Sequence, residues 1–140
     1  MTKNVLITVK GVQQDDAGEM SSSETVVHGE YYFRNGSHYI FYEETVEDSG
    51  EKVKSNLKLK GNTLELIRKG AADSRMIFET GKRHAVDYAT PFGVLKMETV
   101  TFQILLLEEE EHIRIEAEYD LWANEAFVSR CTLTINLEAI

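Results

Sequence analysis

The sequence predicts an all-β protein in which residues 1–140 form a single antiparallel, closed β-barrel of about eight to ten strands. Apolar and polar residues alternate with a period of two, which is typical of half-buried strands and not of helices. One proline and nine glycines punctuate the alternating segments. A flat sheet of about ten short strands would expose two edges, and closure into a barrel removes both. A sandwich of two sheets is the main alternative fold.

Several alternating rows identify the strands and the face of each strand that we expect to point inward. The positions between them carry mainly Lys, Arg, Glu, Asp and Thr, the residue types expected on a face in contact with water. The inward rows are Val5, Ile7 and Val9; Leu57 and Leu59; Leu64 and Leu66; Ile113, Ile115, Ala117 and Tyr119; and Cys131, Leu133, Ile135 and Leu137.

The first tight turn is Asn35-Gly36, because these two residues tolerate the positive φ angles of a type I′ hairpin turn. This turn aligns Gly29 with Tyr42, and the missing side chain of the glycine leaves room for an aromatic ring. The segment 39–44 is apolar or aromatic on both faces, so the sequence leaves open which face is interior.

A second hairpin at Gly61-Asn62 aligns Ser55 with Arg68 and places a guanidinium at the end of an apolar row. Such a charge requires an anion, either an internal carboxylate, with Glu44 or Glu43 the nearest by pattern, or a carboxylate or phosphate of a ligand. The alternative is that Arg68 marks the strand end and reaches water at the barrel rim.

Two further turns follow. A three-residue loop at 80–82 predicts a hairpin in which Phe78 faces His84. Pro91 at the first central position of a turn that closes on Gly93 predicts a stiff corner at a strand end.

The acidic run 108–111 lies between two apolar segments and predicts an exposed hairpin tip. In this register Leu105 and Leu107 point outward, so a patch faces a partner subunit or the strand is covered on both sides. One interpretation is therefore a homodimer through Leu105 and Leu107. The residues expected to point inward are Val100, Phe102, Ile104 and Leu106.

Composition limits the classes of partner. The formal net charge is −9, which opposes nucleic-acid binding because neutralising phosphates needs a basic face. No apolar run is long enough to span a membrane, and the first residues are too short and too alternating for a signal peptide. The single cysteine, Cys131, cannot form an internal disulfide, so we expect a cytoplasmic protein without a membrane partner.

The residues that usually carry chemistry form no recognisable motif. The histidines, His28, His38, His84 and His112, have no pair at metal-ligand spacing. No nucleophile elbow or glycine-rich phosphate loop occurs, so we expect no metal, no cofactor and no catalytic residue. An enzymatic hypothesis remains only if Glu44, His84 and Arg68 converge within hydrogen-bond reach.

Five sequence features together resemble the YwiB-like family of uncharacterised bacterial β-barrel proteins. They are Gly29 before an aromatic run, Tyr39-x-x-Tyr42-x-Glu44, Arg68-x-Gly70, Tyr88-x-Thr90-Pro91-x-Gly93, and Tyr119-x-Leu121. The resemblance covers nearly the whole chain and implies a calycin-like, lipocalin-style barrel from a Gram-positive bacterium, with no established activity. Secreted lipocalins carry a Gly-x-Trp near their first strand, whereas the only tryptophan here, Trp122, comes late. Lipocalin ligands therefore do not transfer to this chain.

The leading functional hypothesis is a barrel that binds a small, partly apolar anionic molecule inside. Arg68 would engage the negative charge, and the other pocket residues would be Tyr42, Glu44, Tyr88, Thr90 and Tyr119. The alternative is an interaction or structural module with a filled barrel and no ligand.

Overall fold

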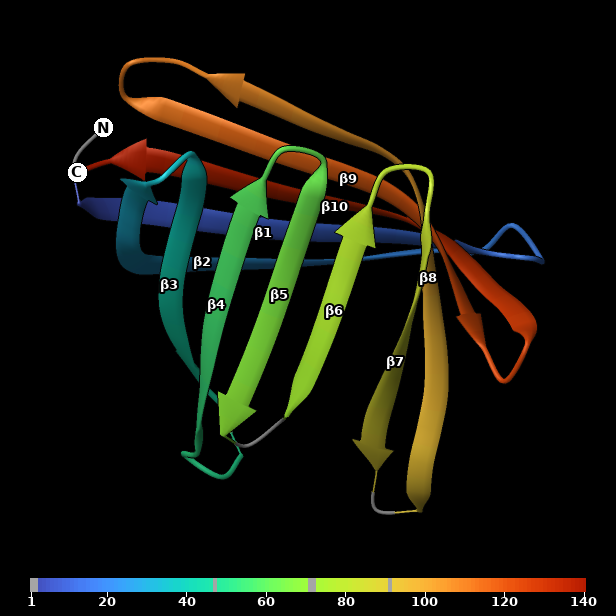
Figure 1. The fold of residues 1–140 in the computed structure, drawn as a ribbon. Coiled ribbons are helices and arrows are strands. Elements are labelled where there is room, and N and C mark those ends of the chain that lie inside the picture. The colour runs from blue at the N-terminus through green and yellow to red at the C-terminus, as the bar shows by residue number, and fades with distance from the viewer. Residues whose placement is uncertain (1–2, 47, 71–72, 91) are drawn as a thin grey trace.

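The chain forms one continuous antiparallel sheet that curls into a nearly closed barrel (Figure 1). The computed structural model describes residues 3–46, 48–70, 73–90 and 92–140, with the backbone alone for 88–90. Within these ranges the strand order is β6-β5-β4-β3-β2-β1-β10-β9-β8-β7. The strands are β1 (Asn4–Asp15), β2 (Met20–Arg34), β3 (Ser37–Thr45), β4 (Lys52–Lys60), β5 (Thr63–Gly70), β6 (Ser74–Glu79), β7 (Arg83–Thr90), β8 (Gly93–Glu108), β9 (His112–Ala123) and β10 (Ala126–Ala139). The predicted all-β class and antiparallel barrel are confirmed.

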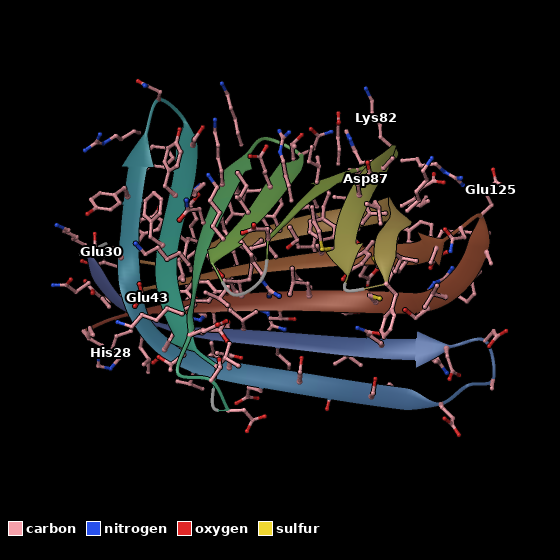
Figure 2. All side chains as sticks on the ribbon, turned by 90° about the horizontal axis from the view of Figure 1, so that it is seen from below. His28, Glu30, Glu43, Lys82, Asp87 and Glu125 are labelled. Atoms are coloured by element: carbon pink, nitrogen blue, oxygen red, sulfur yellow. The ribbon has the colours of Figure 1, made fainter. Side chains whose placement is uncertain are left out.

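Two walls face each other across the interior. Figure 1 shows β1, β9 and β10 running across the view, with β3 to β6 crossing steeply in front of them. Side chains from both walls project into the interior between them, as the view from below shows (Figure 2). The predicted inward rows are confirmed, since their members are buried or pack against the buried core.

The two tight turns give the predicted registers. Asn35 and Gly36 both have positive φ angles, and Gly29 lies opposite Tyr42. The second turn places Ser55 opposite Arg68. The structure also resolves the face of β3 that the sequence left open, because Ile40 and Tyr42 are buried.

The predicted hairpin pairing across residues 80–82 is wrong. β6 and β7 are the two ends of the sheet, and no strand ladder joins their described residues. The loop is held by β8 instead, since the Gly81 N–H donates to the carbonyl of Thr101. Beside it, the Thr99 hydroxyl donates to the carbonyl of Ile77 at 2.7 Å. β8 therefore contacts the loop after β6 at one end of this seam, and within the described residues no ladder between β6 and β7 closes the rest of it.

A β-bulge overturns a second expectation. The register of β8 against β9 shifts between Thr101 and Gln103, so Phe102 is an extra residue that reverses the alternation. Thr99 and Thr101 consequently face the core, whereas Phe102 is 46% exposed. The expectation that Phe102 and Val100 point inward is wrong for this reason.

The close approach of three strands explains why position 29 is glycine. A Cβ atom there would overlap the Ile7 side chain and the Phe41 carbonyl. The backbone carbonyl belongs to the neighbouring strand and cannot move without breaking the sheet. Tyr42 uses the same space for its own side chain.

We expect Gly29→Ala to lower the free energy of unfolding by about 1–3 kcal/mol, because the added methyl group overpacks a site without room. The measurement is urea unfolding followed by circular dichroism. Gly11→Ala is the matched control, since its Cβ would meet only the Ser23 hydroxyl at 3.4 Å. Equal loss of stability in both variants would contradict the steric explanation.

Candidate functional site

A polar layer crosses the interior at one end of the barrel. Toward the other end of the barrel, the inward residues of β3, β4 and β5 are apolar. Ile40, Leu57 and Leu66 are paired there across the three strands. One step further along the strands, the register aligns polar residues instead. They are Tyr42, Ser55, Arg68 and, on β6, Ser74.

The opposite wall contributes a second set of polar groups to this layer. Thr101, Tyr119 and Cys131 are in register across β8, β9 and β10. The Ser129 hydroxyl and the Cys131 thiol are 3.2 Å apart, and both residues are buried. Tyr119 links the two walls, since its hydroxyl lies close enough to Arg68 and Cys131 to be influenced by both.

Three buried polar atoms of this layer have no hydrogen-bond partner among the described residues: Ser55 Oγ, Arg68 Nε and Thr101 Oγ1. Ser55 is completely buried and Thr101 is 1% exposed. Buried polar atoms are nearly always bonded to protein or ordered water, so three unpartnered atoms in one layer indicate a place for an additional polar molecule.

Arg68 lies between the interior and the open seam. It lines an open groove of about 710 Å³ at the side of the barrel where no ladder joins β6 and β7, and outer-face residues of β5 such as Glu65, Ile67 and Lys69 line the same groove. Among the described residues no carboxylate lies within 4.0 Å of its guanidinium. Glu43, one of the two partners predicted from the sequence, pairs with Lys52 at 3.3 Å instead. The internal ion pair proposed from the pattern is therefore not formed.

Burial controls the ionisation of the tyrosines in the layer. Burial raises the pKa of Tyr42, and the neighbouring Ser55 hydroxyl and Arg68 guanidinium act against this shift. The Ser55 oxygen nevertheless makes no hydrogen bond of normal geometry. Burial also raises the pKa of Tyr119. Both phenols are therefore neutral hydrogen-bond donors at neutral pH.

The thiol of Cys131 is not set up for nucleophilic chemistry. Burial raises its pKa, and the nearby Asp120 acts in the same direction, while Ser129 and Tyr119 act against the shift. A buried thiol with a raised pKa is protonated at neutral pH and inert.

Of the six residues predicted to form the pocket, the structure gathers four: Tyr42, Glu44, Arg68 and Tyr119. Glu44 belongs to this group because it is close enough to Tyr42 for its negative charge to raise the pKa of the phenol, whereas the positive charge of Arg68 lowers that pKa. Tyr88 and Thr90 are part of β7, but their side chains lie outside the described residues.

Sequence reasoning missed two contributors to the layer. Ser55 was placed opposite Arg68 by the hairpin register, yet a serine in an alternating strand carries no signal that its hydroxyl is unpartnered. Thr101 was assigned to the outer face because the bulge at Phe102 could not be recognised from the pattern.

A separate buried cluster lies at the other end of the barrel. The Tyr31 hydroxyl is 2.7 Å from His38 Nδ1, and His38 Nε2 is 3.5 Å from Glu108 Oε1. His38 and Tyr31 are buried, whereas Glu108 is exposed. Burial lowers the pKa of His38, and the charge of Glu108 acts against this shift.

The three groups of the enzymatic hypothesis do not converge in the described contacts. His84 bonds Glu79 at 2.8 Å beside the 80–82 loop, whereas Glu44 and Arg68 border Tyr42. Within the described ranges, no three His, Cys, Asp or Glu side chains are grouped as a metal site would require. The same ranges hold no helix with the length and apolarity needed to cross a bilayer.

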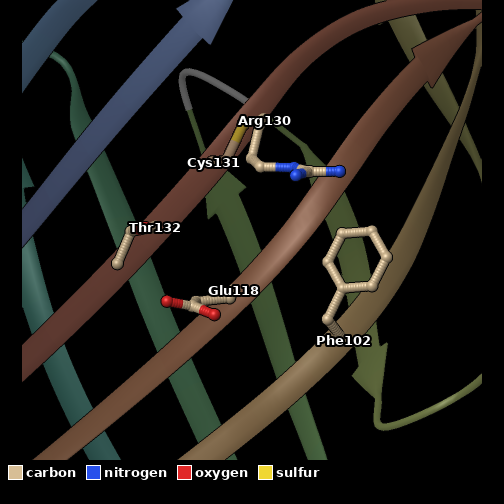
Figure 3. A pocket seen from close by; sticks show the side chains of 5 residues that line it. All are labelled: Phe102, Glu118, Arg130, Cys131 and Thr132. Carbon is tan, nitrogen blue, oxygen red and sulfur yellow. The ribbon is translucent and has the colours of Figure 1, made fainter.

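A shallow cavity of about 260 Å³ lies between β8, β9 and β10 (Figure 3). Arg130 extends across β9 toward Phe102, with its guanidinium carbon 5.0 Å from the ring centroid. Arg130 also pairs with Asp120 at 2.9 Å. Because the guanidinium of Arg130 is already paired with Asp120, this cavity is a weaker candidate for an anionic ligand than the Arg68 layer.

Comparison with known proteins gives a consistent result. A family model described as "Domain of unknown function (DUF1934)" matches residues 7–135. The chain is 31% identical over 134 residues to the "Uncharacterized beta-barrel protein YwiB" of Bacillus subtilis (strain 168), covering 96% of this chain and 92% of the relative. It is also similar to the crystal structure of the ywiB protein from Bacillus subtilis, with a TM-score of 0.83 and 29% identity over 99% of this chain and 92% of that one.

We expect Ser55→Ala to leave the free energy of unfolding unchanged or higher, because it removes a buried hydroxyl without a partner. Ser129→Ala is the matched control and should lose about 0.5–1.5 kcal/mol with its contact to Cys131. Urea unfolding of both variants gives the comparison. A larger loss for Ser55→Ala than for Ser129→Ala would show that Ser55 is partnered in solution.

We expect the pKa of His38 to lie below its ordinary 6.5, measured by NMR titration of the imidazole signal that disappears in His38→Gln. Glu108→Gln should lower the pKa of His38 further, because the negative charge of Glu108 stabilises the protonated imidazole. Since the folded-state pKa is depressed, the stability contributed by the neutral ring is full above 6.5 and is lost as pH falls through the folded-state value. A pKa at or above 6.5 would contradict the dominance of burial.

Proposed function

This chain belongs to the DUF1934 family of β-barrel proteins, and we propose that its barrel binds a small, partly apolar anion in the polar layer around Arg68. The observation that carries this proposal is the buried, unpartnered Arg68 Nε opposite Ser55, whose hydroxyl is also unpartnered, with the unpartnered hydroxyl of Thr101 on the other wall. A guanidinium favours carboxylate and phosphate groups because its N–H groups match their oxygen atoms in pairs.

The surroundings of Arg68 favour a ligand with an apolar part. Leu66 is buried next to Arg68 in β5, and Phe78 packs against Tyr119 with ring centroids 4.6 Å apart. The ligand's charged group would lie at Arg68 and accept hydrogen bonds from the neutral hydroxyls of Tyr42 and Tyr119. Its apolar part would lie against these rings and leucines. Glu44 would disfavour ligands carrying a second negative charge near Tyr42.

The 710 Å³ groove at the open seam supplies an entry route in this proposal. Asp73, Asp87 and Arg75 also line it, so the mouth carries both signs of charge. Selection for an anion would therefore come from Arg68 deeper in the site, not from the mouth. We also infer a cytoplasmic location, since the buried, unpaired Cys131 is compatible with a reducing compartment.

A second candidate function is a protein-interaction module with a filled barrel. The observation that favours it is the exposure of three consecutive leucines on β8, namely Leu105 at 49%, Leu106 at 41% and Leu107 at 51%. Consecutive exposed leucines are unusual on the surface of a monomer and indicate a contact surface.

We expect wild-type protein to bind the apolar sulfonate 1-anilinonaphthalene-8-sulfonate, and Arg68→Met to bind it at least about tenfold more weakly, which corresponds to about 1.4 kcal/mol. The measurement is fluorescence titration of the folded proteins, with native mass spectrometry of freshly purified wild type to detect a retained molecule. Arg34→Met is the matched control because Arg34 is exposed on β2.

The Arg68→Met variant should be as stable as wild type, since an apolar side chain of similar length replaces a partly buried charge without a carboxylate partner. Unfolding in urea checks this and separates lost binding from lost folding. Equal affinity of Arg68→Met and wild type, with no retained molecule in wild type, would contradict the binding proposal.

A further inference from the structure

β8 has a neighbouring strand on both sides only along its first half. β7 pairs with it from Gly93 to Val100, and the 80–82 loop covers Thr101. From Gln103 to Glu108, β9 is the only strand that pairs with it within the described part of the chain. Figure 1 shows this half of β8 as the outermost strand beyond β9, at the top of the view. Its outer backbone groups form a free edge that another strand can extend.

This edge lacks the usual protection against pairing. The five residues 103–107 read Gln-Ile-Leu-Leu-Leu and contain neither a charge nor a proline. Natural edge strands normally carry one of these, or a bulge within the exposed stretch. The bulge of β8 comes before this stretch, at Phe102. The edge is therefore apolar on both faces and long enough to pair.

We propose that a second copy of this chain pairs antiparallel with the β8 edge, about a two-fold axis at Leu105. In this arrangement Leu105 lies opposite the partner's Leu105, and Ile104 lies opposite the partner's Leu106. The pairing would cover both the free backbone groups and the exposed leucines of β8. A two-fold contact also closes on itself and leaves no further edge at β8.

Charge selects the antiparallel direction and argues for a second copy as the partner. The acidic run 108–111 lies at one end of the edge. Exposed Lys82 and Arg130 lie at the other end, where Lys82 accepts a backbone hydrogen bond from Thr101 and Arg130 lies over the Phe102 ring. Antiparallel pairing brings the acidic run of each copy to the cations of the other, whereas parallel pairing would bring two acidic runs together.

Both cations remain available for this contact. Lys82 is 66% exposed although it pairs with Glu79, and Figure 2 shows it projecting away from the barrel. Arg130 crosses the outer surface of β9, as Figure 3 shows. The inference deepens the second candidate function and does not depend on anion binding at Arg68, which lies on a different strand.

Sedimentation equilibrium of the full chain tests the proposal. Wild type should form a species of twice 15.9 kDa at micromolar to submillimolar concentrations. Leu105→Glu places two carboxylates opposite each other at the axis and should weaken the dimer at least about tenfold. Val26→Glu adds the same charge at an equally exposed apolar position on β2 and should leave the dimer unchanged.

A second variant keeps the test decisive if Leu105→Glu fails to fold, which circular dichroism detects. Lys82→Glu changes an exposed side chain outside the edge and should also weaken the dimer, with the difference from wild type shrinking at high salt. A wild-type mass of 15.9 kDa at every concentration overturns the proposal. Unchanged dimerisation in folded Leu105→Glu, or in Lys82→Glu at low salt, overturns it as well. None of these three results bears on the proposed binding of an anion at Arg68.

Discussion

The candidate site depends on the register of β2 to β5. Because antiparallel pairs keep a constant sum of residue numbers, the turn at 35–36 determines every pair of β2 with β3, and the turn at 61–62 determines every pair of β4 with β5. The ladder between β3 and β4 then places Tyr42 beside Ser55. A shift of one residue would send Arg68 to the outer surface and bring Lys69 inside. Gly29 strengthens the same constraint, since only a position without a side chain accepts Tyr42 and Ile7 so closely.

This register divides the interior into an apolar part and a polar part with different physical roles. The apolar rows bury leucines, isoleucines and Phe78 and supply the driving force for folding. The polar layer adds little to stability, because some of its buried hydroxyls and the Arg68 Nε have no partner among the described residues and carry desolvation penalties. Such groups next to an opening support the proposed binding of an anion, because they do not contribute to stability. Arg130 differs from Arg68 in this respect, because the Asp120 carboxylate pairs with its guanidinium at 2.9 Å.

The sequence predicted the features that follow from local rules. Alternation identified the strands, the Asn-Gly and Gly-Asn turns gave registers, and inward rows followed from both. The bulge at Phe102 could not be predicted, because apolar residues occur on both faces of the strand around it. Nothing in the sequence pattern therefore shows that the inward and outward faces are exchanged there. The missing ladder between β6 and β7 could not be predicted either. The short loop between these strands predicts a hairpin, and its sequence does not show that its backbone is hydrogen-bonded to Thr101 instead. The unpartnered state of Ser55 depends on the three-dimensional surroundings of its hydroxyl and has no sequence signal.

The seam and the free edge of β8 have a common structural cause. β8 is longer than β7, which pairs only as far as Val100, and the loop after β6 bonds Thr101 instead of continuing a ladder. On one side of this junction the ladder is missing between β6 and β7, and the groove at Arg68 lies along that gap. On the other side β8 continues alone with β9 and presents its leucines. The bulge at Phe102 lies at this junction and turns the side chain of Thr101 toward the interior. The free edge of β8, from Gln103 to Glu108, begins directly after the bulge. The proposed ligand entry and the proposed self-association would thus both depend on this one break in barrel closure, on opposite sides of Thr101.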